Sequence, residues 1–395
     1  MRLPCAKGER FLPADRVTTG WSKLGRFGYA LACFIFRFLR RPLFASNIVL
    51  AGQSFNGIVP SVSVPVGIIF GAVGSGVIVM IGYRFIHYLN RIATWVMGLS
   101  ILAGFMYIVT HVTSTDFLSR GEFTVSGWLS MVSIAALWQI AFAPYVSDYS
   151  RYLPENTTMK STFWATYLGS VLGSSLSFIF GAVAVLAVAP GPDAMDAVRI
   201  ASGPFGLLML VLFLLSVITH NALNLYGAVL SIITSVQTFV SQWMPAARAR
   251  VTLCVVIIIF CSYAAIGVSS DFITHFVDLV LTLLVVLVPW ASINLVDFYV
   301  VQKSKYHIES IFRDDGGIYG RFNLNAMMAY AVGIVIQVPF MNTPMYTGPL
   351  PAHLNGVDLS WLIGIAVTVP VYWWLALRDT SYRRKQIEVM SSLQG

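Results

Sequence analysis

Charged side chains are scarce in this sequence. Asp, Glu, Lys and Arg make up 11% of its 395 residues, whereas 57% are hydrophobic; the mean hydropathy is +0.76. A soluble domain carries roughly a quarter of charged residues. A chain this apolar has too little polar surface to cover itself in water, so we expect a lipid bilayer to be its solvent.

Signatures of catalysis and of metal binding are also missing. The sequence has no nucleophile elbow, phosphate-binding loop, HExxH motif or pair of catalytic carboxylates. Its four cysteines lie far from metal-ligand spacing, which favours packing roles. The glycine pair Gly67 and Gly71 is spaced for helix packing. These absences argue against an enzyme and against a metal site.

Long apolar runs dominate what the sequence does contain. A membrane-spanning helix needs about 20 mostly apolar residues, and ten segments meet or approach this length. They cover residues 42–59, 65–82, 92–111, 127–146, 161–189, 204–234, 251–268, 272–300, 323–340 and 359–377. A shorter stretch at 27–39 is interrupted by Arg37, which favours an amphipathic or partly inserted helix. The pattern predicts an all-α polytopic membrane protein.

The basic residues of the loops set a direction across the membrane. The net charge is +8, but the basic residues lie in short loops between apolar runs, so nucleic acid is not an expected partner. If the loop after the first span faces outward, the outer loops contain only Arg120 and Arg199. The inner segments then contain fourteen: Arg84, Arg91, Arg151, Lys160, Arg248, Arg250, Lys303, Lys305, Arg313, Arg321, Arg378, Arg383, Arg384 and Lys385. This bias predicts a cell-membrane protein with a cytoplasmic C-terminus.

The span at 127–146 carries a first candidate site. Pro144 removes a backbone donor, so we expect the helix to be broken or distorted near residues 141–144. Trp138, Gln139 and Phe142 lie just before that point, and an aromatic face beside an amide suits a planar polar ligand. The alternative is a tilted helix whose aromatic side chains face lipid.

Other polar residues lie within the spans. Thr219, Asn221 and Asn224 fall close together, with the two asparagines three apart on one helical face; they suit either a transport pathway or hydrogen bonds between helices. Asp278 is a candidate coupling carboxylate, or a residue close to the outer interface. Asp297 is expected to be solvated near the inner end of its span.

Four segments carry a resemblance to a known family. AFAPYVSDYSRYLPENT at 141–157 closely resembles the segment after the sixth helix in the purine–cytosine permease branch of the nucleobase–cation symporter family. PWASINLVDFYVVQKSKYHIESIFRDDGGIYGRFN at 289–323 resembles the region after that family's tenth helix. FASNIVLAGQSFN at 44–56 and IGYRFIHYLNR at 81–91 resemble its third helix and fourth loop.

The resemblance implies a fold and a division of the chain. The family has twelve helices, of which the first ten form two inverted five-helix repeats around a site at the membrane midplane. The similarity covers residues 43–378, so we expect a transporter domain there, a basic segment at 1–42 and a cytoplasmic tail at 379–395. The first two family helices have no counterpart in 1–42, which implies an incomplete fold.

The resemblance also implies site residues. The substrate of the family is held between aromatic groups and amides of the third, sixth and eighth helices. The matching positions are Trp138 and Gln139 with Phe142 nearby, Asn224 with Asn221 nearby, and Asn47. One of the family's aromatic positions, on the third helix, falls on Leu43, so the aromatic contact with the substrate is weaker on that side. Thr219 alone fits the cation-binding hydroxyl positions, so the coupling ion is H⁺ or Na⁺.

Two functional hypotheses follow. The first is a permease that imports nucleobases or related planar heterocycles by cation symport, without any other cofactor. The second is a non-transporting remnant that inserts into the membrane but cannot complete a transport cycle. Neither the particular heterocycle nor the oligomeric state is fixed by the sequence.

Overall fold

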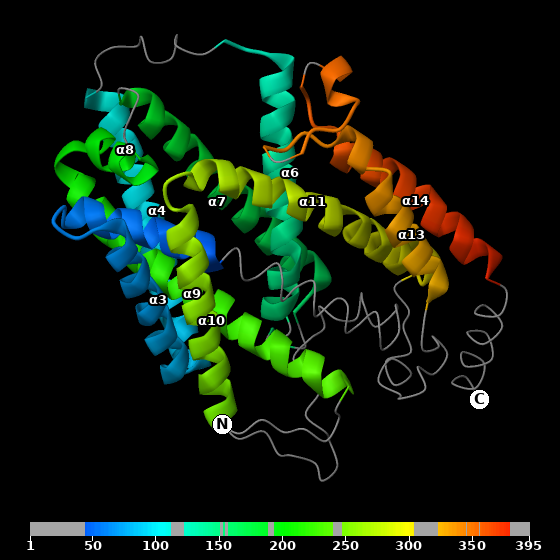
Figure 1. The fold of residues 1–395 in the computed structure, drawn as a ribbon, viewed down its shortest axis with the longest axis horizontal. Coiled ribbons are helices and arrows are strands. Elements are labelled where there is room, and N and C mark those ends of the chain that lie inside the picture. The colour runs from blue at the N-terminus through cyan, green and yellow to red at the C-terminus, as the bar shows by residue number, and fades with distance from the viewer. Residues whose placement is uncertain are drawn as a thin grey trace.

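The computed structural model of the chain is helical throughout most of the residues it describes, which are 44–111, 122–150, 153–154, 157–188, 193–239, 247–303, 323–344, 346–354 and 356–379. Residues 44–58 form the first helix, shown in the darkest blue (Figure 1). The later α-helices are α3 (Val64–Ile81), α4 (Tyr83–His111), α6 (Val125–Ser150), α7 (Met159–Ala187), α8 (Ala194–Ala201), α9 (Gly206–Phe239), α10 (Ala247–Val268), α11 (Phe272–Val296), α13 (Leu324–Val335) and α14 (Ser360–Arg378). A π-helical turn, Asp297–Val301, follows α11, and 3-10 turns cover Gly203–Phe205, Val338–Phe340 and Pro351–Leu354.

Most of the expected spans are present. Within the described residues, eight helices are long and apolar enough to cross a membrane, and they coincide with eight of the ten predicted segments. The other two segments are helical but shorter. The first is helical over 44–58, and the ninth consists of α13 and the turn after it. The N-terminal segment 1–42, Leu43 and the tail after Asp379 lie outside the described residues.

Of the two predicted outcomes near Pro144, a break and a distortion, the break is wrong, because α6 runs as one helix from Val125 to Ser150. An interior proline removes one intrahelical hydrogen bond, which a helix can accommodate by bending rather than by ending. The helical segment that contains Trp138 and Gln139 therefore continues past Pro144, and no unwound backbone lies beside these residues.

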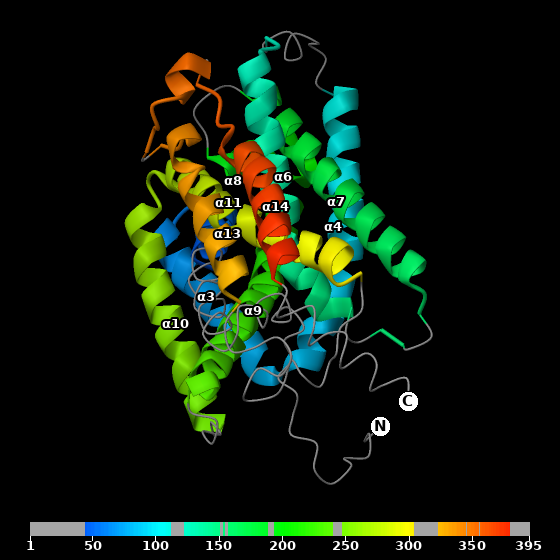
Figure 2. The same ribbon diagram turned by 90° about the vertical axis from the view of Figure 1, so that its right-hand side faces the viewer.

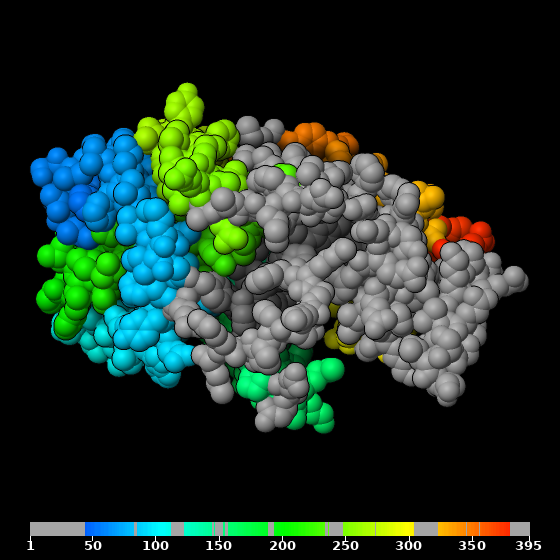
Figure 3. Space-filling view, turned by 90° about the horizontal axis from the view of Figure 1, so that it is seen from below, coloured from blue at the N-terminus to red at the C-terminus, as the bar shows by residue number. Residues whose placement is uncertain are grey.

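The helices form two groups. In the first, α9 packs against α3, α4, α8 and α10; in the second, α11 packs against α6, α13 and α14 (Figure 1). α7 contacts α4 and α8, and it also touches α6. Figure 2 faces the second group and shows α13 and α14 side by side. Seen from below, the blue and cyan segments lie at the opposite end from the orange and red ones (Figure 3).

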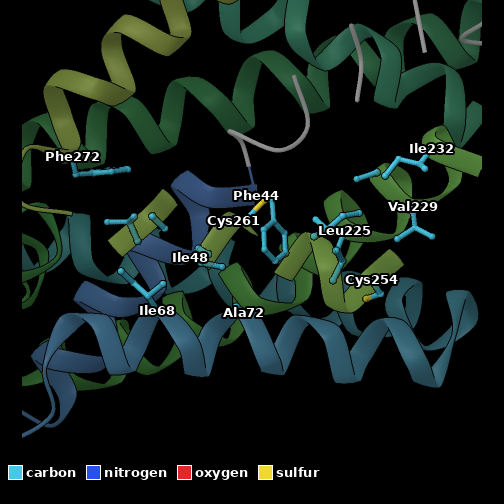
Figure 4. Close-up of a cluster of buried hydrophobic side chains, with 14 of the residues drawn as sticks. Phe44, Ile48, Ile68, Ala72, Leu225, Val229, Ile232, Cys254, Cys261 and Phe272 are labelled. Atoms are coloured by element: carbon cyan, nitrogen blue, oxygen red, sulfur yellow. The ribbon is translucent and has the colours of Figure 1, made fainter. Parts of the chain in front are cut away.

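An apolar core fixes the start of the first described helix. Figure 4 shows Phe44 directed into a cluster of buried side chains from the helix 44–58, α3, α9 and α10, close to Leu225. Cys254 and Cys261 are both buried in this cluster, which confirms their predicted packing role. Phe276 of α11 packs against this core and also against the core between α6 and α11, so it joins the two groups of helices.

Glycines allow the helix 44–58 to approach α3 closely. A Cβ atom on Gly52 would lie 2.7 Å from Ile68 Cγ1 and 2.8 Å from the carbonyl oxygen of Val64. A Cβ atom on Gly67 would lie 2.9 Å from the Cα atom of Gly52. One on Gly71 would lie 2.6 Å from the Cβ atom of Ala51, which belongs to the helix 44–58. The predicted packing role of Gly67 and Gly71 is confirmed, because backbones this close leave no room for a side chain.

We therefore expect Gly52→Ala to destabilise the protein by about 1–3 kcal/mol, because the added methyl group overpacks a contact between two backbones. Gly98→Ala is the matched control, since a Cβ atom on Gly98 meets nothing within 4 Å and alanine favours helix formation. The apparent melting temperature in detergent measures both effects. A Gly52→Ala protein as stable as the Gly98→Ala protein would contradict the close approach.

A proline inside α11 is compensated by side chains of α13 and of the turn that follows it. Pro289 has no N–H to donate to the carbonyl oxygen of Val285. Gln337 Nε2 donates to that oxygen at 2.9 Å instead. The Tyr330 hydroxyl donates to the next carbonyl, that of Val286, at 3.3 Å. Backbone groups that the proline exposes in α11 are thus paired within the protein, as the interior of a membrane requires.

Gln337→Leu should lower stability by about 1–3 kcal/mol, because the Val285 carbonyl oxygen loses a buried donor. The double variant Pro289→Ala/Gln337→Leu should recover part of this loss, since an alanine in place of the proline restores an N–H for the same oxygen. Apparent melting temperatures of the three proteins test the pairing. Equal values for the wild type and Gln337→Leu would show that Gln337 does not compensate for the proline.

Candidate substrate site

Three side-chain amides meet where the helix 44–58 contacts α9. Asn47 Nδ2 donates to Oδ1 of Asn221 at 3.3 Å, and Asn224 Nδ2 donates to the same oxygen at 3.2 Å. Asn221 Nδ2 donates to the carbonyl oxygen of Phe44 at 3.2 Å. Asn221 is 0% exposed and Asn224 is 2% exposed. We call Asn47, Asn221 and Asn224 the amide cluster; it is enclosed among the helices.

The sequence pattern of the two helices places this cluster at the edge of the apolar core. Phe44 and Ile48 flank Asn47 and point into the core, while Leu225 lies one turn after Asn221 on α9. Amides in such surroundings are costly to leave unpaired, so their mutual hydrogen bonds fix their positions. The prediction of hydrogen bonds between helices is confirmed here, and the same bonds gather three of the residues predicted to bind substrate.

The aromatic and amide groups of α6 contact α7 in this conformation. Ser170 Oγ donates to Gln139 Oε1 at 2.5 Å, and Gln139 Nε2 donates to Ser174 Oγ at 3.1 Å. Trp138 is 50% exposed, and its ring meets Phe178 edge-on with centroids 6.0 Å apart. The structure thus does not add Trp138 and Gln139 to the amide cluster. Phe142, one turn after Trp138, is half-buried.

Thr219 is buried near the cluster on α9. Its hydroxyl donates to the carbonyl oxygen of Ser216 at 2.9 Å, within the helix. Its own carbonyl oxygen accepts a long hydrogen bond from Asn90 Nδ2 of α4, at 3.4 Å. Ser75 Oγ of α3 donates to the neighbouring carbonyl, that of Ile218, at 3.1 Å. Side chains of α3, α4 and α9 therefore meet at Thr219, the residue predicted to bind a coupling cation.

The two carboxylates of α11 and the turn after it differ in burial. Asp278 is half-buried in the described structure. The expectation that Asp297 is solvated is wrong: it is 2% exposed, and the Tyr372 hydroxyl of α14 donates to its Oδ1 at 2.7 Å. α14 covers this end of α11, which the apolar pattern of α11 alone does not indicate.

Sequence reasoning missed the partners of the site residues. Asn90 and Ser75 contact the backbone of α9, while Ser170 and Ser174 hold Gln139. The spacing of Ser170 and Ser174, four residues apart, places both hydroxyls on one helical face. That spacing was a usable signal for a polar contact, although it does not name Gln139 as the partner.

An array of membrane-length helices that encloses amides and hydroxyls away from lipid is typical of a membrane transport protein. Residues 27–364 match the family of permeases for cytosine/purines, uracil, thiamine and allantoin. Because this match covers most of the chain, the protein belongs to that family. The match begins at residue 27, within the basic segment 1–42.

Named relatives are permeases, which agrees with the prediction of a transporter rather than an enzyme. The chain is 31% identical over 380 residues to YxlA of Bacillus subtilis (strain 168), which carries the name "Putative purine-cytosine permease"; the match covers 94% of this chain and 81% of YxlA. It is 23% identical over 361 residues to the purine-cytosine permease fcyB of Emericella nidulans, covering 85% of this chain and 67% of fcyB.

Solved structures of the transporter Mhp1 share the fold. The inward-facing structure has a TM-score of 0.65 at 17% sequence identity, and the match covers 93% of this chain and 80% of Mhp1. The closed structure, described as a nucleobase-cation-symport-1 family transporter with bromovinylhydantoin bound, has a TM-score of 0.64 at 18% identity, covering 93% and 82%. This likeness confirms the predicted transporter fold.

Proposed function

We propose that this protein imports nucleobases or related planar heterocycles across the cell membrane, and that the import is coupled to H⁺ or Na⁺. The chain belongs to a permease family for such compounds. The bias of basic residues toward one set of loops supports a cytoplasmic C-terminus. The bilayer is the solvent of the described helices.

The amide cluster is the observation that carries this proposal. Two buried asparagines of α9 and the half-buried Asn47 provide both donors and acceptors, which match the amide-like edges of a nucleobase. Buried polar groups that bind a ligand's N–H or carbonyl give strong selection against analogues without them. A cluster of this kind inside an apolar bundle suits recognition of a small neutral heterocycle.

The aromatic side of the proposed site consists of the rings of Trp138 and Phe142, together with the amide of Gln139. The half-exposed ring of Trp138 offers a face on which a flat ligand can stack. Gln139 is held by Ser170 and Ser174, so it reaches a ligand only after exchanging those hydrogen bonds. We infer that α6 changes its contacts with α7 during the transport cycle.

Uptake by intact cells tests the function. Cells that express the chain should accumulate labelled cytosine, uracil, allantoin or thiamine above the level of cells with an empty vector. A protonophore should abolish the accumulation if H⁺ is the coupling ion, and replacement of Na⁺ should abolish it if Na⁺ is. A folded chain in the membrane without uptake of any of the four would favour the non-transporting alternative.

Asp278 and Thr219 are the proposed coupling residues. Measuring the exchange of substrate across the membrane separates a defect in ion coupling from a defect in substrate binding. If protonation of Asp278 drives import, Asp278→Asn should reduce concentrative uptake of the carried substrate at least tenfold while substrate exchange across the membrane persists. Thr219→Val should have the same pattern if Na⁺ binds at the hydroxyl. Concentrative uptake that survives both substitutions would remove these two residues from the coupling mechanism.

A further inference from the structure

The orientation of the Asn221 side chain follows from its hydrogen bonds. A backbone carbonyl oxygen can only accept a hydrogen bond, so the Asn221 group that faces the Phe44 carbonyl must be Nδ2. The Asn221 group on the other side of the amide is then Oδ1. This oxygen accepts from Asn47 at 3.3 Å and from Asn224 at 3.2 Å.

The same logic fixes the amide of Asn47. Because its partner atom on Asn221 is an acceptor, Asn47 must point its Nδ2 toward Asn221. The carbonyl oxygen Oδ1 of Asn47 therefore points away from Asn221. Without Asn221, the amide could rotate by half a turn and present either end, since its two ends differ little in shape.

Asn221 itself is poorly placed to bind a ligand. Its side chain is 0% exposed. Both acceptor positions of Oδ1 are taken by the two neighbouring asparagines, and Nδ2 donates to the first turn of the helix 44–58. An amide oxygen accepts about two hydrogen bonds, so none of its acceptor capacity remains for a substrate.

We propose that Asn221 is a positioning residue rather than a substrate contact, and that it holds Asn47 with the carbonyl oxygen toward the substrate. This inference rests on the proposed function. It narrows the substrate class: the heterocycle presents an N–H or amino group to Asn47, rather than a carbonyl or a ring nitrogen acceptor. Asn221 also ties the start of the helix 44–58 to α9, so both amides keep one geometry.

A double-mutant cycle tests the positioning role. Binding of cytosine to the purified full chain in detergent is measured for wild type, Asn47→Ala, Asn221→Ala and the double variant. If Asn221 acts through Asn47, each single substitution should weaken binding about tenfold or more, and the double variant should be little worse than either. Asn56→Ala is the control, because Asn56 bonds to Val62 at the far end of the same helix. If the losses of affinity in the two single variants multiply in the double variant, the proposal is overturned.

Analogues test the donor edge. Binding is compared for cytosine, 1-methylcytosine, which lacks the N1–H, and 2-pyrimidinone, which lacks the amino group. The wild type should disfavour at least one analogue by about tenfold or more. Asn47→Ala and Asn221→Ala should both reduce that ratio to within about threefold, which a general loss of stability would not do. A ratio that survives in Asn221→Ala but not in Asn47→Ala would overturn the positioning role.

Failure of the proposed function and failure of the positioning role of Asn221 give different results. If wild-type protein binds no cytosine but binds another of the four candidate compounds, the cycle is run with that compound. If it binds none, the proposed function fails, and the cycle is measured on the melting temperature of the ligand-free protein. There, additive effects of Asn47→Ala and Asn221→Ala would contradict the hydrogen-bonded arrangement itself.

Discussion

Replacing Asn224 by alanine should reduce uptake of the carried heterocycle by about tenfold to a hundredfold while leaving the protein folded. Asn224 is 2% exposed and belongs to the amide cluster. Losing one partner of a buried hydrogen bond costs about 1–3 kcal/mol, and each 1.4 kcal/mol is a factor of about ten in affinity. The effect should appear mainly as weaker substrate binding, because the substitution removes a polar side chain of the site and leaves the apolar side chains of the surrounding core in place.

Asn294 provides the matched control for this prediction. It is also an asparagine within an apolar span, but its Nδ2 donates to the Trp290 carbonyl oxygen inside α11. Uptake rates over a range of substrate concentrations, normalised to the folded protein in the membrane, should be close to wild type for Asn294→Ala. Uptake by Asn224→Ala that equals uptake by Asn294→Ala would remove Asn224 from the site.

Trp138→Ala should weaken substrate binding by about tenfold or more, whereas Trp138→Phe should retain most of it. Stacking of a base on an aromatic side chain contributes about 1–3 kcal/mol, and phenylalanine keeps a ring at this position. Because Trp138 is 50% exposed, its removal creates no large internal cavity. Loss of function in a stable protein is therefore the expected outcome.

Trp164 is a suitable control for Trp138. It is 55% exposed on α7 and packs only among its neighbours Phe163 and Tyr167 in the described ring contacts. Trp164→Ala should preserve binding of the substrate, measured by thermal stabilisation of the purified protein. Equal losses in Trp138→Ala and Trp164→Ala would mean that aromatic side chains at these positions act on insertion or stability rather than on substrate.

Much of the fold could be predicted because lipid imposes simple rules on a sequence. Every spanning segment must be helical and apolar over a fixed length, so the spans are visible as runs without charge. Predictions from the sequence of a single helix fail where contacts with other helices decide the structure. Pro144 predicts a broken or distorted helix, and α6 continues past it without a break. A proline removes one backbone donor, and the packing around the helix decides whether the helix ends or bends there. Asp297 is predicted to be solvated, yet the hydroxyl of Tyr372, 75 residues later in the chain, donates a hydrogen bond to its carboxylate.

The candidate site was predictable in part for a similar reason. Asn221 and Asn224 share a helical face, so their proximity follows from spacing alone. Asn47 is 174 residues from Asn221, and only the resemblance to a family of permeases suggested that they meet. The spacing of the two serines that hold Gln139 indicates a polar helical face, but nothing in the sequence identifies Gln139, 31 and 35 residues earlier, as their partner. Hydrogen bonds between helices depend on packing, which a single sequence does not encode in any local pattern.

Counterflow in liposomes tests the central claim most directly, because exchange of substrate requires a binding site that opens to both sides and needs no gradient of the coupling ion. Liposomes with the purified chain are loaded in turn with unlabelled cytosine, uracil, allantoin or thiamine, and the labelled compound is added outside. We predict transient accumulation of label for at least one compound with wild type and Asn294→Ala, and strongly reduced accumulation with Asn224→Ala. No accumulation above protein-free liposomes for any of the four would contradict the account.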